Sequence, residues 1–507
     1  MRDTRLSRAK KNIATSLVSQ IVALICGIVV PRLMIGAFGS EAYGATTSIV
    51  QFLAYITLLE GGIGGVARAT LYKPLAQGDM KTISAIMGEV KHFFRVIAWI
   101  FIGYVFILAC GFQTISKITC MDWISTFILV LVISISTFGQ YFIGISHSIF
   151  LQADQKSYIT NFISIVATVL NALCTIVLIQ FNCSLIVVKL ASSLIFFMRP
   201  VILSLYIRKY YSLKFHKEKN KTSYLTQKWT GLGQHIAYFL HSNTDIAILT
   251  ILVDLKTVAI YSVYNMIVSH MQSLVVSFSS GMESIFGDML ARDEKKKLHD
   301  TFQTYETILS VVSIILFSVA SVLIVPFIKL YTDGVTDADY IQPLFSFFMI
   351  LTALTYCLRL PYHSLVIAAG HFKQTNVAAY GEAILNIVLS VILVFRFHLI
   401  GVVISTLIAT WFRFGYYVFY LSKHIFNRSI KMFLKRLIIN ISTLVCNCVA
   451  GGIVTSCFAF ENYMEWMFCG AILVTIVSII TFGLNFIFFR RGCYALIKKI
   501  SNKKVSI

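Results

Sequence analysis

The fold follows from the stretch LQADQKSYITNFISIVATVLNALCTIVLI (151–179), which occurs a second time, in altered form, as VIAAGHFKQTNVAAYGEAILNIVLSVILV (366–394). The two copies lie 215 residues apart and align without a gap, with Leu170-Asn171 on Leu385-Asn386. Each copy is apolar over about 20 residues, which is the length that a helix needs to cross a membrane. The same offset superposes segment 45–70 on 258–286. This pattern predicts a duplicated set of membrane helices.

Fourteen apolar segments of membrane length fill the chain. A soluble core is excluded, because 57% of the residues are hydrophobic, 13% are charged and the mean hydropathy is +0.80. The predicted spans are 12–35, 45–70, 96–112, 123–150, 158–179, 184–206, 230–253, 258–286, 307–330, 341–369, 377–395, 400–420, 437–459 and 466–489.

The charges of the loops predict the orientation. With a cytoplasmic N-terminus, the inside segments hold 33 of the 43 Lys and Arg, whereas the outside loops hold only Lys117, Lys256 and Arg396. Basic residues concentrate on the cytoplasmic side of membrane proteins. We therefore expect both termini to be cytoplasmic, in a bacterial cytoplasmic membrane.

The net charge of +21 does not indicate nucleic-acid binding, because the basic residues lie next to helix ends, where they hold topology and contact anionic lipid. The basic start MRDTRLSRAKK precedes a long apolar run, which we interpret as an uncleaved first span. Eleven scattered cysteines form neither a metal-binding nor a disulfide pattern.

The repeat predicts the organisation of the chain. We expect an all-α polytopic membrane protein with 14 transmembrane helices, in which two parallel six-helix repeats form N- and C-lobes around a central cavity. The predicted N-lobe is 1–212, a basic cytoplasmic linker follows at 213–229, and the C-lobe is 230–425. Residues 426–507 would add spans 13 and 14 and a basic tail.

Charged side chains inside spans are costly and normally face a bundle interior or a wet cavity. Arg199, Arg359 and Arg413 lie deepest, and two interpretations stay open. They either bond helix carbonyls beside prolines or line a cationic cavity for a diphosphate or acidic sugar, which a forked donor suits. The candidate substrate-binding residues are Arg32, Arg199, Arg359, Arg413, Lys189 and Glu60.

Acids inside the second repeat suggest a coupling site. Asp245 follows His241 by one helical turn, and Glu382 precedes Asn386 by one turn. Oxygen ligands from Asp245, Glu382 and Asn386 would hold Na⁺, and a carboxylate there would equally carry a proton. A buried hydrogen-bonded network or a pairing with arginine remains the alternative.

Three stretches carry a family resemblance: PRLMIGAFGSEAYG (31–44), LLEGGIGGVAR (58–68) and NTDIAILTILVDLKTVAIYS (243–262). They resemble the polysaccharide-transporter branch of the multidrug/oligosaccharidyl-lipid/polysaccharide exporter superfamily, which includes O-antigen and capsule-repeat flippases. The Gly that this branch usually has before the Tyr of span 8 is replaced by Ala259-Ile260. The resemblance implies a cation site between spans 7 and 11, as in lipid II flippases.

We therefore expect a transporter that flips a polyprenyl-diphosphate-linked oligosaccharide by alternating access, for cell-surface polysaccharide assembly. It would act as a monomer, without a cofactor, among membrane lipids and other polysaccharide-assembly proteins. A cation-coupled multidrug exporter of the same superfamily is the alternative. A polytopic glycosyltransferase or polymerase would need a site such as Asp337-Ala-Asp339, and the outer loops are too short to house one.

Overall fold

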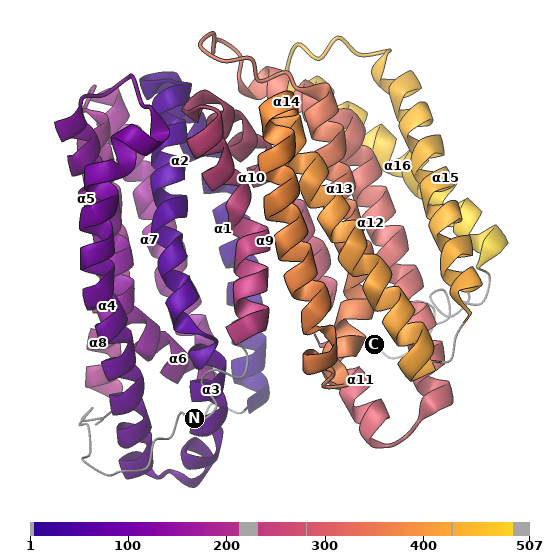
Figure 1. The fold of residues 1–507 in the computed structure, drawn as a ribbon, viewed down its shortest axis with the longest axis horizontal. Coiled ribbons are helices and arrows are strands. Elements are labelled where there is room, and N and C mark those ends of the chain that lie inside the picture. The colour runs from indigo at the N-terminus through magenta and orange to yellow at the C-terminus, as the bar shows by residue number, and fades with distance from the viewer. Residues whose placement is uncertain (1–4, 212–231, 280, 427–428, 490–507) are drawn as a thin grey trace. The chain divides into compact units, whose positions relative to one another are not determined.

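The computed structural model describes residues 5–211, 232–279, 281–426 and 429–489 (Figure 1). Every regular element in these ranges is helical. The chain divides into two compact units, Met1–Phe239 with Leu249–Ser262, and Leu240–Ile248 with Val263–Ile507. The first part of the chain forms α1 Arg5–Phe38, α2 Ser40–Ala54, η1 Tyr55–Glu60, α3 Ile63–Gln77, α4 Met80–Ser116, α5 Trp123–Gly139, η2 Gln140–Gly144, α6 Ile145–Ala153, α7 Ser157–Gln180 and α8 Leu185–Tyr210. The second part forms α9 Leu232–Leu252, α10 Leu255–Ser279, α11 Met282–Ala291, α12 Lys295–Tyr331, α13 Pro343–Ala368, α14 Phe372–Leu421, η3 Ser422–Phe426, α15 Ile430–Thr455 and α16 Tyr463–Phe488.

Eleven helices within the described ranges are long and apolar enough to cross a membrane. One of them, Gln374–Phe426, covers two predicted spans, because the backbone of His398 (φ 45°, ψ −122°) breaks α14 between them. Helices α9 and α10 correspond to the two remaining predicted spans. The prediction of an all-α, multi-pass membrane protein is confirmed.

Large apolar side chains cover the outside of the helices. Ile107 on α4 is 73% exposed and Phe181 at the end of α7 is 76% exposed, and many similar residues accompany them. A soluble monomer rarely exposes so much apolar surface. These faces are therefore the ones that contact lipid.

The structure repeats at the offset found in the sequence. The first residues of three helix pairs are each 215 positions apart, namely Ser40 and Leu255, Met80 and Lys295, and Ser157 and Phe372. Helices α4 and α12 also have the same length, 37 residues. Gln155 and Gly370, again 215 apart, both have a left-handed backbone, with φ of 58° and 69°.

The two longest equivalent helices of the repeat, α4 and α12, both bury large aromatic side chains. In the first unit, α4 buries Phe94, Phe101 and Phe112, which are at most 1% exposed. In the second unit, α12 buries Phe302 and Phe317 in the same way. The duplicated helices α4 and α12 are therefore equivalent in packing as well as in length.

The second predicted span is not one continuous helix. Gly61 and Gly62 follow the 3₁₀ segment η1 with left-handed φ angles of 59° and 80°, so that α3 starts in a new direction. Residues with a side chain rarely adopt this conformation, which explains the glycine pair. The fourth span contains a π-helical turn, η2, a feature that often marks functional sites.

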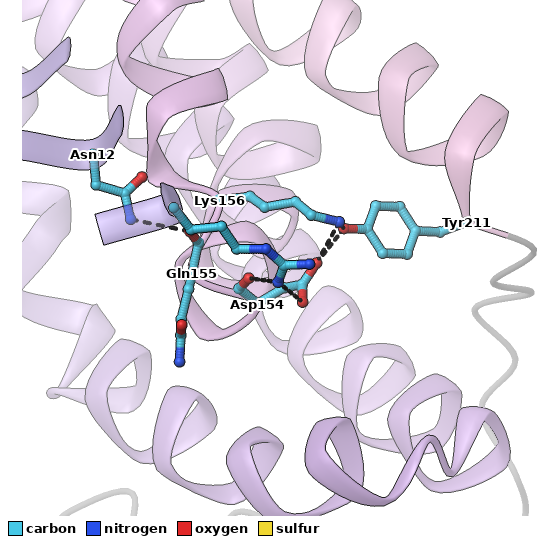
Figure 2. A network of polar contacts seen from close by, with 6 residues as sticks. Asn12, Asp154, Gln155, Lys156 and Tyr211 are labelled. Atoms are coloured by element: carbon cyan, nitrogen blue, oxygen red, sulfur yellow. Dashed lines mark hydrogen bonds and ion pairs between the residues drawn. The ribbon is translucent and has the colours of Figure 1, made fainter. Parts of the chain in front are cut away.

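A polar cluster fixes the turn between α6 and α7 (Figure 2). Asp154 forms ion pairs with Lys156 (2.8 Å) and Arg8 (3.4 Å), and it accepts a hydrogen bond from Tyr211. Asn12 donates to the backbone oxygen of Gln155 at 3.0 Å. The start of α1 and the end of α8 are thereby tied to the same turn.

Candidate functional site

Two arginines share one buried carboxylate in the second unit. Glu382 on α14 is fully buried, and its two oxygens lie 2.5 Å from Nη1 of Arg359 on α13 and 2.5 Å from Nη1 of Arg413 on α14. Arg359 and Arg413 are only 4% and 5% exposed. Of the two alternatives that the sequence left open for Glu382, the structure shows the pairing with arginine.

Aromatic rings complete this cluster. The guanidinium of Arg359 lies 4.9 Å from the ring centroid of Tyr356, and that of Arg413 lies 5.3 Å from the ring of Tyr417. Arg413 Nε also donates to the hydroxyl of Tyr417 at 3.0 Å. Cation–π contacts of this kind strengthen when they are shielded from water. The two guanidiniums are therefore held in fixed directions.

One helical turn beyond Glu382, Asn386 belongs to a second polar group. Asn386 Nδ2 donates to Thr406 Oγ1 at 3.0 Å, and Thr406 Oγ1 lies 3.2 Å and 3.3 Å from the two carboxylate oxygens of Asp245. Asp245 and Asn386 are 6% and 0% exposed. The structure thus brings the predicted Asp245 and Asn386 together on either side of Thr406.

Thr406 was missed by the sequence reasoning, although the repeat contained a signal for it. In the first unit Asn171, the repeat equivalent of Asn386, accepts a hydrogen bond from Ser192. Ser192 and Thr406 are 214 residues apart, the same separation as Arg199 and Arg413. An Asn–hydroxyl pair is therefore common to both repeats, and Asp245 is added to it in the second.

The remaining basic candidates lie in the first unit. Arg199 on α8 donates to Ser164 Oγ on α7 at 2.6 Å. Arg413 makes the equivalent contact in the second repeat, because its partner Glu382 lies in the part of α14 before the break at His398. Arg32 on α1 and Lys189 on α8 are half-buried. These three side chains belong to the first unit, whereas the cluster around Glu382 belongs to the second.

Glu60 lies where the two irregular helical segments of the first unit meet. Its carboxylate accepts a hydrogen bond of 2.5 Å from Tyr141 in the π-turn η2, and Tyr141 is only 4% exposed. Eight residues further on, Arg68 donates to Gln152 on α6 at 2.5 Å. These contacts hold the helix break at Gly61 and Gly62 against η2 and α6.

Two further residues that the sequence analysis named are His241 and Asp339. His241 lies on α9, and its side chain falls outside the described residues. In the acidic pair of the loop between α12 and α13, Asp339 has a structural role, because its oxygens accept hydrogen bonds from Ile341 N and Gln342 Nε2 at the start of α13. Within the described residues, no cluster of three or more His, Cys, Asp or Glu side chains could hold a metal ion.

Residues 232–392 match the MatE family model, a range that includes Asp245, Arg359, Glu382 and Asn386. A sequence comparison with curated proteins found no match.

Solved structures with a similar fold are transporters. A lipid II flippase, MurJ, in an inward closed conformation superposes with a TM-score of 0.67 at 14% identity, covering 93% of this chain and 98% of that one. An inward-facing multidrug resistance MATE family transporter of the MOP superfamily gives 0.55 at 14% identity, over 80% and 94% of the two chains. The MATE transporter VcmN of Vibrio cholerae gives 0.52 at 14% identity, over 82% and 97%. Residues 232–392 therefore match the MatE family model, and the chain has the fold that the lipid II flippase and these MATE transporters share.

Proposed function

We propose that this protein flips a lipid-linked oligosaccharide, joined to its polyprenyl carrier through a diphosphate, across a bacterial cytoplasmic membrane by alternating access. The observation that supports this function is the buried Arg359–Glu382–Arg413 cluster. The sugar and diphosphate would pass through the protein, while the polyprenyl chain stays in the lipid. The flipped intermediate would then serve cell-surface polysaccharide assembly.

The charge of the cluster favours an anionic substrate. Two guanidiniums share one carboxylate, so the group of three carries one excess positive charge. Each guanidinium has five N–H donors in a rigid fork, a geometry that matches phosphate oxygens. Glu382 accepts one hydrogen bond from each arginine. The remaining donors suit a diphosphate.

Asp245 would couple this charge to a cation gradient. With Asp245 ionised, the two acids balance the two arginines; with its charge neutralised, the arginines are in excess. Carboxylate, amide and hydroxyl oxygens at Asp245, Asn386 and Thr406 are hard ligands that suit Na⁺, and the carboxylate alone suits a proton. Neutralising Asp245 would therefore strengthen the binding of an anionic head group to Arg359 and Arg413.

Export of organic cations is the second candidate, because several similar folds belong to multidrug transporters. Two observations favour the flippase. An organic cation would be repelled by the two guanidiniums of the arginine cluster when Asp245 is neutralised. In addition, the likeness to the lipid II flippase extends over 93% of the chain, against 80% and 82% for the two multidrug transporters.

Flipping in proteoliposomes tests the arginine cluster. A lipid-linked oligosaccharide would be incorporated, and its exposure on the outer leaflet followed with a glycosidase added outside. We expect Arg359→Lys and Arg413→Lys to retain partial activity, because charge remains but the fork is lost, and Arg→Ala at either position to abolish it. Arg396→Ala, at an exposed arginine, is the matched control. Normal flipping by both Ala variants at wild-type abundance would show that the cluster does not bind the substrate.

The coupling site is tested separately with Asp245→Asn. This variant keeps the shape of the side chain, so substrate binding should persist while the dependence of flipping on a gradient is lost. Loss of Na⁺ dependence would identify a sodium site, and loss of pH dependence without a Na⁺ effect would identify a proton site. Wild-type flipping that ignores both gradients would end the coupling proposal without touching the arginine cluster.

A further inference from the structure

Helix α15 buries a stripe of polar side chains and exposes most of its large apolar side chains. Its buried residues are Arg436, Ile439, Asn440, Thr443, Asn447 and Gly451, so four of the six have polar side chains. Large residues such as Ile438, Val445 and Val449 are more than half exposed on the opposite face. The polar stripe packs against α12 and α16, and we call this interface the α15 seam. Polar side chains that join membrane helices normally do so by pairing with each other.

At Thr481 the seam contains two amide oxygens that lack a donor. Asn447 Nδ2 donates to Ser318 Oγ (3.1 Å) and Thr481 Oγ1 (3.0 Å), and Asn485 Nδ2 donates to the backbone oxygen of Thr481 (2.9 Å). Within the part of the chain that the structure describes, Oδ1 of Asn447 and Oδ1 of Asn485 have no hydrogen-bond partner. Both residues are at most 1% exposed. The amide nitrogens are thus used for helix contacts, and the oxygens are left for another donor.

At the end where α15 begins, the same seam has donors that lack a hydrogen-bond acceptor within the described residues. Arg436 donates from Nη2 to Thr307 Oγ1 at 3.0 Å, and its Nε lies 3.4 Å from Glu306 Oε2. Among the described residues, Arg436 Nε and Nη1 have no hydrogen-bond acceptor, and Asn440 Oδ1, between Arg436 and Asn447, also has no partner. The ring of Phe489 lies over the guanidinium at 4.4 Å.

From these atoms we infer that the α15 seam binds a chain of water molecules, which enters at Arg436 and reaches Asn447. Water both accepts and donates, so one kind of ligand can satisfy the guanidinium N–H groups and the amide oxygens of Asn440, Asn447 and Asn485. A metal cation would be coordinated by the oxygens, but it would leave Nε and Nη1 of Arg436 without a hydrogen-bond acceptor and would be repelled by the guanidinium. Nothing in the sequence indicates this site, because asparagine and threonine in an apolar segment are usually isolated helix contacts.

Thiol accessibility tests the water chain directly. Asn447→Cys and Asn440→Cys would be compared with Val449→Cys, whose side chain lies on the exposed apolar face, in a background with Cys446 and Cys448 replaced by Ala. A small hydrophilic methanethiosulfonate reacts only with a hydrated thiol, since the thiolate is the reactive form. We expect the two seam cysteines to react about tenfold faster than the lipid-facing one. Equal rates at all three positions would overturn the inference.

Two further measurements keep the inference testable if a cysteine variant folds poorly. Synchrotron hydroxyl-radical footprinting of the wild-type protein should oxidise Ile439 or Phe489 beside the seam faster than Val449, and the reverse order would count against water. Asn447→Leu should lower the melting temperature of a hydrated seam, whereas a rise would show a dry seam relieved of an unpaired amide. Slower labelling of Asn447→Cys in Na⁺ than in choline would show a cation instead, and would overturn the water chain.

Discussion

The arginine cluster predicts an unusual order of destabilisation. Removing Arg413 leaves Arg359 and Glu382 as an intact ion pair. Removing Glu382 instead leaves two buried guanidiniums facing each other without the carboxylate that both of them bind. Breaking a buried ion pair by removing one partner costs about 3–5 kcal/mol, because an uncompensated charge remains. Glu382→Leu strands two charges and should cost at least this amount, and Arg413→Leu should cost much less.

The loss of stability can be measured as a fall in the melting temperature. For a unit of this size a loss of 1 kcal/mol lowers the melting temperature by about 2–4 °C, so Glu382→Leu should lower it by about 10 °C. Purified variants in one detergent would be heated and the monodisperse fraction followed by size-exclusion chromatography. The double variant Glu382→Leu/Arg359→Leu buries one stranded charge instead of two, and should recover part of the loss. If Glu382→Leu is no less stable than Arg413→Leu, the shared carboxylate does not hold the cluster together.

Three other predictions follow from the structure. Gly44→Ala should sharply reduce the yield of folded protein in expression trials, because its Cβ would lie 1.8 Å from a backbone oxygen at the start of α10, whereas Gly103→Ala meets nothing within 4 Å and should behave like wild type. Burial, and after it the charge of a neighbouring carboxylate, raise the pKa of the Cys120 thiol to about 11, so its alkylation by maleimide should still accelerate about tenfold per pH unit between pH 8 and 10; a plateau by pH 9 would contradict this. Reporter fusions after Asp337 should be outside and those after Asp293 inside, and finding both on one side would refute the predicted topology.

The sequence was sufficient for the number and nature of the spans. Membrane helices are recognisable in a sequence by their length and hydropathy. The 215-residue offset of the sequence also separates the first residues of the equivalent helices. The breaks within spans were less visible. The glycine pair at 61–62 stands in a glycine-rich run of the sequence, but nothing in the sequence distinguishes the π-turn at 140–144 from an ordinary helix, since it differs only in hydrogen-bond register.

Some residues of the candidate site were predictable from the sequence, but which side chains contact one another was not. Asp245, Glu382 and Asn386 stand out because polar side chains are costly in a membrane. Which of them meet depends on the rotation of each helix, and one residue of rotation turns a side chain by about 100°. Glu382 and Asn386 lie on one face of α14, yet the first pairs with arginines and the second with Thr406. A hydroxyl such as that of Thr406 is too common in apolar helices to be selected from sequence.

The length of α4 has a consequence for the bilayer itself. Its 37 residues extend about 55 Å at about 1.5 Å per residue, well beyond a hydrocarbon layer of about 30 Å. The charged side chains Lys81, Glu89, Lys91 and Arg95 all fall in the first part, and the 21 residues from Val96 to Ser116 are free of charge. That uncharged part measures about 31 Å, so a thicker membrane must either thin locally or cover Arg95. The position of Arg95 therefore limits the thickness of membrane that α4 crosses without covering a charge, and the length of the lipid acyl chains should affect the stability of this fold.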